Sequence, residues 1–188
     1  MVQYDGILLC HKPFGVSSHD VIANLRQVIG QRRMGHTGTL DPLATGLMLI
    51  CLGRATKIAQ FLSDMDKTYE AEIKLGVRSS TFDAEGVIEN DPPQPVPNLS
   101  KAEMEDIFSE FRGSIRQKVP AFSAIKRNGQ RLYKAARMGK KVNPPERNIE
   151  IKEIKLIGIN LPFVNFVVCC SKGTYIRSLA QDIGSKLN

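Results

Sequence analysis

The sequence predicts an α+β fold, in which a mixed and largely antiparallel sheet is flanked by helices. Segments with strand-like alternation and segments with helical periodicity are interspersed without a regular β-α-β order, and such an order is what a parallel sheet would require. The chain has 188 residues, of which 42% are hydrophobic and 24% are charged. These values are typical of soluble globular proteins, and this length makes a single domain the default expectation.

The beginning of the chain is predicted as a strand followed by a helix. Residues 6–10 form a short apolar run, and residues 17–30 have helical periodicity. Ser17 is placed to cap this helix together with Asp20, in a capping box with Asp instead of Glu, and Gly30 is placed to end it. The apolar positions that we expect on one face of the helix are Val21, Leu25, Val28 and Ile29.

The middle of the chain is predicted as strand, helix, strand and loop. Residues 47–52 form an apolar run of strand length, and residues 55–62 suggest a short helix. Residues 67–75 alternate in polarity, as half-buried strands do. Residues 78–99 are polar and rich in proline, so we expect a loop with a turn at residues 83–86.

The remaining predicted elements are two helices and two long strands. Residues 100–111 form a second capped helix, and residues 149–159 and 163–170 form the strands. Thr174 is placed to cap the last helix. The apolar face of that helix consists of Ile176, Leu179, Ala180, Ile183 and Leu187.

One segment accounts formally for the whole positive net charge of the chain, which is +7. Residues 126–141 carry seven Lys or Arg and no acid, whereas the other 19 Lys and Arg balance the 19 Asp and Glu. Within residues 120–146 we expect a hairpin that turns at Asn128-Gly129, followed by a short basic helix at residues 132–138. A localised basic patch indicates a polyanion, nucleic acid first. A solvated lysine-rich face is the alternative.

One carboxylate stands out because of its setting. The segment GHTGTLDPLATG at residues 35–46 carries Asp41 between glycines and directly before an apolar strand. Pro42 favours an extended conformation at Asp41. Catalytic groups are often carried on loops that a rigid scaffold positions in this way. A plain turn aspartate is the alternative, because Asp-Pro is common in turns.

Four segments carry a resemblance to a known family. They are KPFGVSS at residues 12–18, GHTGTLDPLATG at 35–46, KTYEAEIKLG at 67–76 and GTYIRSLA at 173–180. In this order they resemble the bacterial tRNA pseudouridine synthase B family, which isomerises a uridine in the T loop of tRNA.

The resemblance implies a pseudouridine synthase catalytic fold over residues 1–188, with residues 120–146 as a thumb-like RNA-binding insertion. The family continues into a small C-terminal RNA-binding domain, which we expect to be absent from this chain.

The resemblance also implies roles for single residues. Asp41 matches the catalytic aspartate, which could add covalently, act as a base or stabilise a cationic sugar. Arg177 would pair with it and keep it ionised. Tyr69 would stack on the target base, Tyr175 would line the pocket, and Lys12 would support the site or contact RNA. By residue type alone, the alternative for Tyr69 is a core aromatic of a strand, and the alternative for Arg177 is an exposed arginine on a surface helix.

Other residues are expected to bind the RNA. The target base lies inside the folded T loop, so it has to be flipped out. His36 matches the family histidine that fills the resulting gap, although by type alone it is a turn histidine. Phosphate contacts by Lys126, Arg127, Arg131 and Lys134 would supply affinity rather than sequence choice.

We expect neither a cofactor nor a metal. The isomerisation involves no net redox change, and the three histidines lack partners at metal-ligand spacing. The cysteines are expected to be buried reduced thiols, which favours a cytoplasmic protein. No membrane span or signal peptide is visible. We expect a monomer that binds the T-arm stem-loop of tRNA. The cysteines are Cys10, Cys51, Cys169 and Cys170.

Two other functions compete with this interpretation. One is a non-catalytic RNA-binding module or tRNA-folding chaperone, since residues 35–38 superficially fit the GXXG loop of a KH domain. Asp41-Pro42 and the strand after it fit that module poorly. The other is a nucleotide or glycoside hydrolase. The sequence has no phosphate-binding glycine motif, and a glycosidase normally needs two carboxylates that flank the bond.

Overall fold

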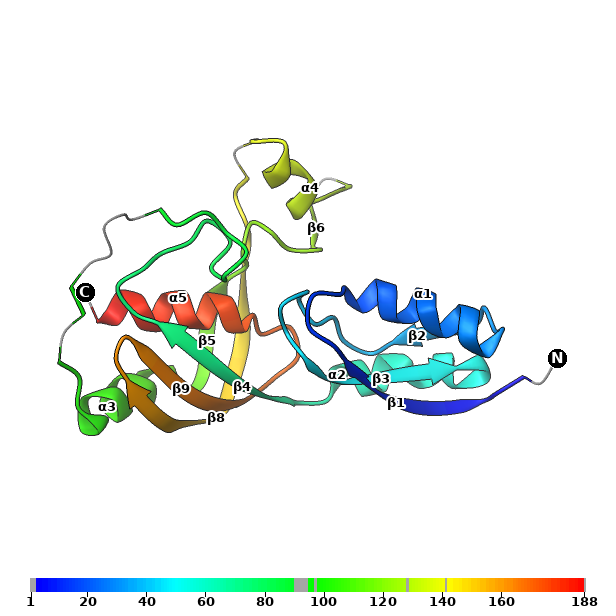
Figure 1. Ribbon diagram of the computed structural model, residues 1–188, viewed down its shortest axis with the longest axis horizontal. Coiled ribbons are helices and arrows are strands. Elements are labelled where there is room, and N and C mark those ends of the chain that lie inside the picture. Colours follow the sequence, from blue (N-terminus) through cyan, green and yellow to red (C-terminus); the bar gives the residue numbers. More distant parts are fainter. Residues whose placement is uncertain (1–2, 90–94, 97, 128, 141, 188) are drawn as a thin grey trace. The chain divides into compact units, whose positions relative to one another are not determined.

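A computed structural model describes residues 3–89, 95–96, 98–127, 129–140 and 142–187. The chain divides into two compact units, Met1–Met65 and Asp66–Asn188. Each unit combines helices with antiparallel strands, as Figure 1 shows. The predicted α+β class with a largely antiparallel sheet is therefore confirmed. The division falls inside the span that the sequence predicts as one catalytic domain.

The first unit contains a small sheet and short helices, which in chain order are β1 (Gly6–Lys12), α1 (Ser18–Ile29), β2 (Met34–His36), β3 (Gly46–Leu52), the 3₁₀ helix η1 (Gly53–Ile58) and α2 (Ala59–Asp64). The strands pair in the antiparallel order β1-β3-β2. Helix α1 packs on this sheet, since Val21 and Ile22 share a buried cluster with Met34, Met48 and Ile50. The loop that carries Asp41 joins β2 to β3.

The ends of α1 form as predicted. Ser17 and Asp20 make a complete capping box, and Gly30 ends the helix in the left-handed conformation, with φ of 69°. The predicted position of Val28 is wrong, because its side chain is 84% exposed while that of Ile22 is buried. The buried residues of the helix are Ser18, Val21 and Ile22, and Leu25 and Ile29 are partly buried, so the buried face does not reach Val28.

Two details of the first unit differ from the prediction. The short helix expected at residues 55–62 begins earlier, as η1, and becomes α-helical only in α2. Strand β2 was not predicted at all. It has only three residues, which is too short for alternation to be recognised.

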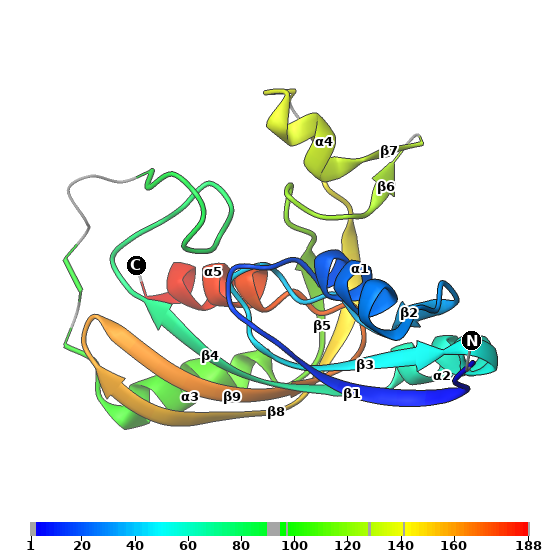
Figure 2. The ribbon, with the colours of Figure 1, turned by 45° about the vertical axis from the view of Figure 1, so that its right-hand side comes forward.

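The second unit is larger and consists of β4 (Lys67–Lys74), α3 (Lys101–Phe111), β5 (Gly113–Lys118), β6 (Lys126–Arg127), β7 (Gln130–Arg131), α4 (Leu132–Arg137), β8 (Glu146–Asn160), β9 (Phe163–Cys170) and α5 (Ile176–Lys186). Its main sheet has the antiparallel order β4-β9-β8-β5, and β6 pairs with β7 in a separate hairpin. Figure 2 shows the hairpin and α4 beyond the ends of β5 and β8.

Helices α3 and α5 cover one face of the main sheet. Strand β9 buries alternate residues, among them Val164, Phe166 and Val168, each fully inaccessible to solvent. Phe108 of α3 packs its ring 5.5 Å from that of Phe166, and Leu179 of α5 belongs to the same cluster. The apolar face predicted for the last helix is therefore confirmed in α5.

The prediction that Thr174 caps α5 is wrong. Tyr175 occupies the N-cap position and makes no side-chain capping bond. The hydroxyl of Thr174 instead donates to the carbonyl oxygen of Ser171 at 2.9 Å, inside the preceding turn. The second capped helix forms as predicted, because Ser100 and Glu103 of α3 make a capping box.

The basic insertion has less strand than predicted. Of the described residues before the predicted turn, only Lys126 and Arg127 are paired in the hairpin, with Arg131 and Gln130 respectively. Asn128 of the predicted turn lies outside the described residues. Helix α4 covers most of the predicted helix at residues 132–138. Among the described helices of both units, none is long and apolar enough to cross a membrane.

Candidate active site

The loop that carries Asp41 is attached to its own unit on both sides of the aspartate. The hydroxyl of Ser18, at the start of α1, accepts a hydrogen bond from the N–H of Leu40 and donates to the Leu40 carbonyl, both at 2.9 Å. The N–H of Gly15 donates to the carbonyl oxygen of Pro42 at 2.9 Å. The residues before and after Asp41 are therefore held in place.

Lys12 supports the same loop from inside the protein. Its side chain is fully buried, and its Nζ donates to the carbonyl oxygens of Pro13 at 3.0 Å, Val16 at 2.6 Å and Pro42 at 3.0 Å. Burial lowers the pKa of Lys12, and the charge of Asp41 opposes this shift. Of the two roles expected for Lys12, this geometry fits support of the site rather than contact with RNA.

His36 lies at the end of β2, directly before this loop. Its imidazole is partly buried, and this burial is the main reason that the pKa of His36 lies below its usual value of 6.5. A smaller lowering comes from His19 on α1, whereas the backbone of Gly38 acts in the opposite direction. Burial therefore favours the neutral form of the His36 imidazole.

Arg177 of α5 lies in a largely buried polar setting in the second unit. Its Nη1 is 3.6 Å from Oδ2 of Asp83, and the two side chains are only 10% and 20% exposed. Nη1 also donates to the carbonyl oxygen of Thr81 at 3.4 Å, and Nη2 donates to that of Phe122 at 3.1 Å. These contacts fix the plane of the guanidinium.

Asp83 was missed as a candidate site residue. The sequence places it only in a turn of a polar loop, and that turn is present, since the N–H of Gly86 reaches the Asp83 carbonyl. Thr81 donates its hydroxyl to the Asp83 carboxylate, and Ser79 donates to the Asp83 carbonyl oxygen. No local sequence signal joins Asp83 to Arg177, because the contact depends on the tertiary fold.

Tyr175 is held by two hydrogen bonds to its backbone. Its N–H donates to Oε1 of Gln117 at 2.8 Å, and Nε2 of the same side chain donates to the Tyr175 carbonyl oxygen at 3.1 Å. Gln117 is fully buried. The guanidinium carbons of Arg147 and Arg177 lie 5.4 and 6.0 Å from the Tyr175 ring centre, within the range of cation–π attraction.

Tyr69 lies in the middle of β4, opposite Val168 of β9. It is partly buried and packs against the core of the second unit. This position fits a core aromatic, and it also leaves part of the side chain accessible.

The structure brings the predicted residues together within each unit. Lys12 lies against the Asp41 loop, and Tyr175 lies beside Arg177. The expected pairing of Asp41 with Arg177 joins residues of different units, so it stays a prediction. The stacking expected for Tyr69 and the insertion expected for His36 involve RNA and also stay predictions.

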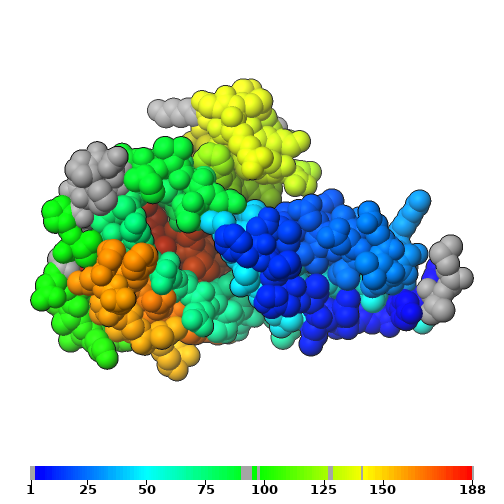
Figure 3. Space-filling model, in the orientation of Figure 1, coloured from blue at the N-terminus to red at the C-terminus, as the bar shows by residue number. Residues whose placement is uncertain are grey.

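The residues predicted to contact phosphates lie in a segment of the second unit that is coloured yellow to yellow-green in Figure 3. Lys126 and Arg131 face each other across the β6-β7 hairpin, and both are exposed, as is Lys134 on α4. The guanidinium of Arg137 lies 5.7 Å from a tyrosine ring centre one turn earlier. The backbone of Arg127 pairs with Gln130, whereas its side chain lies outside the described part.

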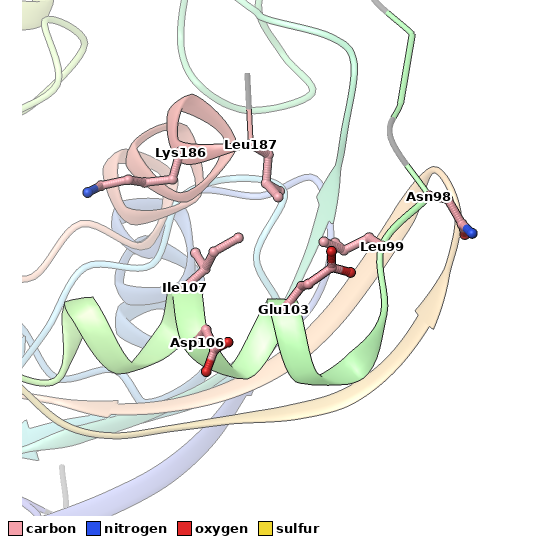
Figure 4. A pocket seen from close by; sticks show the side chains of 7 residues that line it. All are labelled: Asn98, Leu99, Glu103, Asp106, Ile107, Lys186 and Leu187. Atoms are coloured by element: carbon pink, nitrogen blue, oxygen red, sulfur yellow. The ribbon is translucent and has the colours of Figure 1, made fainter.

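One pocket in the second unit holds none of the predicted site residues. It has a volume of about 370 Å³ and lies between the start of α3 and the end of α5; Figure 4 shows its lining. No group of three potential metal ligands occurs within the described ranges. All four cysteines are free; Cys51 and Cys170 are buried, and Cys10 and Cys169 are half-buried.

Comparison with known proteins identifies the family. A sequence model described as "TruB family pseudouridylate synthase (N terminal domain)" matches residues 26–176. A protein of Francisella tularensis subsp. novicida named tRNA pseudouridine synthase B is 48% identical over 186 residues, which cover 99% of this chain and 61% of that protein. A protein of the same name from Bacillus cereus is 48% identical over 191 residues, with 97% and 61% covered.

Solved structures agree with this assignment. The crystal structure of a Cbf5-Nop10-Gar1 complex matches with a TM-score of 0.73 and 28% identity over 97% of this chain and 44% of that one. An H/ACA RNP bound to a substrate RNA that contains 2′-deoxyuridine matches with a TM-score of 0.69 and 25% identity, covering 97% of this chain and 43% of the other. The present chain spans 61% of the length of the two curated relatives. It belongs to the TruB family of pseudouridylate synthases.

Proposed function

We propose that this chain isomerises uridine to pseudouridine in the T loop of tRNA. The observation that carries the proposal is the loop around Asp41, which matches the catalytic segment of the family and is fastened by Ser18, Gly15 and Lys12. Family membership supports the reaction class, because the curated relatives are named tRNA pseudouridine synthase B.

The reaction balances without a cofactor. The N1–C1′ bond of the uridine breaks, the base turns while it stays bound, and a C5–C1′ bond forms. The proton at C5 leaves and N1 gains a proton, so the product is an isomer of the substrate. The protein has to provide a carboxylate near the sugar, a pocket that holds the free base, and a group that moves the proton.

Asp41 is the proposed catalytic group of this reaction. As a carboxylate it acts at C1′, C2′ or C6, by covalent addition, by proton removal or by stabilising a cationic sugar. Arg177 pairs with Asp41 in this proposal and keeps it ionised and oriented. Its contacts to Asp83, Thr81 and Phe122 support this role, because they preset the guanidinium. Asp83 is then a positioning residue.

Binding of the uridine requires base flipping. His36 fills the place that the base leaves, and its position directly before the Asp41 loop supports that role. Tyr69 stacks on the flipped base, and Tyr175 lines the pocket beside Arg177.

The basic hairpin and α4 bind the backbone of the T arm in this proposal. The exposed Lys126, Arg131 and Lys134 support phosphate contacts, and Arg127 adds another cation. Such contacts give affinity rather than base choice. The substrate complex is proposed to contain one copy of the chain.

The test is product mapping in an unmodified tRNA transcript. We expect pseudouridine at the T-loop uridine, and no product in a matched transcript with cytidine at that position. Binding of both transcripts without product in either would favour the alternative, a non-catalytic RNA-binding module or folding chaperone. Pseudouridine formed elsewhere in the tRNA would contradict the T-loop assignment and keep the reaction class.

A further inference from the structure

Phe14 is an exposed aromatic side chain at the turn between β1 and α1, with 67% of its surface accessible. Single exposed apolar side chains are common on protein surfaces, so exposure alone assigns no role. What distinguishes Phe14 is the rigidity and the place of the turn that carries it.

The turn is closed around a buried ammonium group. Lys12 Nζ donates to the carbonyl oxygens of Pro13 and Val16, which lie on either side of Phe14 along the chain. Gly15, directly after Phe14, has φ of 81°, a conformation that glycine adopts at little cost. The backbone that presents the Phe14 ring is therefore fixed before any ligand binds.

The same turn is bonded to the Asp41 loop. The N–H of Gly15 donates to the carbonyl oxygen of Pro42 at 2.9 Å, and Lys12 reaches the same oxygen at 3.0 Å. Gly15, which directly follows Phe14, is therefore hydrogen-bonded to Pro42, which directly follows Asp41. All these groups belong to the first unit, so their arrangement does not depend on the second.

We propose that the Phe14 ring stacks on an unpaired base of the RNA next to the uridine that Asp41 converts. The inference rests on the proposed function and adds a binding contact to it. Unpaired RNA bases are commonly bound by stacking on aromatic side chains. Because the backbone that carries the ring is already held, stacking has to order only the side chain of Phe14, and the apolar area of Phe14 leaves water only in the complex.

The test compares Phe14→Ala with Phe61→Ala. Phe61 lies on α2 of the same unit and is 66% exposed, so it controls for the loss of an exposed ring of the same size. The ligand is a T-arm stem-loop RNA, and its affinity is measured by titration at fixed salt. Thermal unfolding of each variant checks that the fold is intact.

We expect Phe14→Ala to weaken RNA affinity by roughly 5- to 150-fold, the range observed when a stacking aromatic is replaced by alanine. Phe61→Ala should bind as the wild type does, and Phe14→Trp should retain affinity because it keeps an aromatic face. A 2-aminopurine placed beside the target uridine should lose fluorescence on binding to the wild type and less on binding to Phe14→Ala.

Two results would overturn the inference: unchanged affinity in Phe14→Ala, or an equal loss in Phe61→Ala. The result is separable from the proposed function, because affinity and fluorescence require no turnover. If the wild type binds the RNA but forms no pseudouridine, the proposed function fails, and the comparison of the two variants still decides the role of Phe14.

Discussion

Replacing Lys12 with methionine tests the claim that a buried ammonium group holds the Asp41 loop. Methionine has a similar length and fills the same space without a donor. The carbonyl oxygens of Pro13 and Val16 then lose the Lys12 donor, whereas that of Pro42 keeps the N–H of Gly15. The substitution therefore leaves two carbonyl oxygens, rather than three, without a hydrogen-bond donor from the protein.

The magnitude follows from these two acceptors. An unsatisfied buried group costs about 1–3 kcal/mol, and the lower end applies because Pro13 is exposed and water can reach its carbonyl group. The gross loss is about 2 kcal/mol on this basis. Part of this loss of stability is offset, because burial of the charged Lys12 side chain is itself unfavourable and the variant removes that charge. We expect a net loss of about 1–2 kcal/mol, which corresponds to a decrease in Tm of about 2–8 °C for a chain of this size.

The assay is thermal unfolding followed by circular dichroism, with Lys57→Met as the control. Lys57 is an exposed lysine on η1 of the same unit, so its replacement should leave Tm unchanged. Pseudouridine formation by Lys12→Met should decrease more than RNA affinity does, because the loop next to Asp41 loses its anchor. An unchanged Tm together with unchanged activity would show that the Lys12 ammonium group does not hold the Asp41 loop.

Three further predictions concern the second unit. Asp83→Asn should lower the rate of pseudouridine formation by at least tenfold, because Arg177 loses its charged neighbour, and RNA affinity should stay within twofold of the wild-type value. Single-turnover assays measure the rate and titrations measure the affinity. Equal effects on rate and affinity would contradict a positioning role for Asp83. Lys126→Glu combined with Arg131→Glu should weaken RNA binding and reduce the slope of log affinity against log salt by about 1.4–1.8, and an unchanged slope would remove the hairpin from the interface. Burial raises the pKa of Asp182 above 3.8, so the folded state holds this proton more tightly and the free energy of unfolding decreases as pH rises from 3.8 through the raised pKa. Asp182→Asn should remove that decrease in denaturant titrations from pH 3 to 7, and identical pH profiles for the two proteins would show the expectation to be wrong.

The sequence predicted well those features that depend on local interactions. The capping box of Ser17 and Asp20 and the end of α1 at Gly30 depend on residues close in the chain. The apolar faces of α3 and α5 follow from helical periodicity. Strand β5 was missed because its fully buried inward residue is Gln117, a polar side chain that breaks the expected alternation.

The site was predicted less completely, for a physical reason. Motif resemblance predicts which residues react or bind, and it points to Asp41 and Arg177. It does not indicate what holds them. The contact between Asp83 and Arg177 and the two bonds between Gln117 and Tyr175 join segments far apart in the sequence, so only the folded unit reveals them. The anchoring of the loop through Lys12 and Pro42 is of the same kind.

The central claim is that Asp41 makes this chain a pseudouridine synthase. The most direct measurement is release of tritium from tRNA transcript labelled at C5 of uridine, with the wild type and Asp41→Asn compared at equal protein and saturating RNA. We expect tritium release by the wild type only, with RNA affinity nearly equal for both proteins. Equal tritium release by Asp41→Asn would contradict the assignment of Asp41, and release by neither protein, with RNA bound to both, would contradict catalysis by this chain.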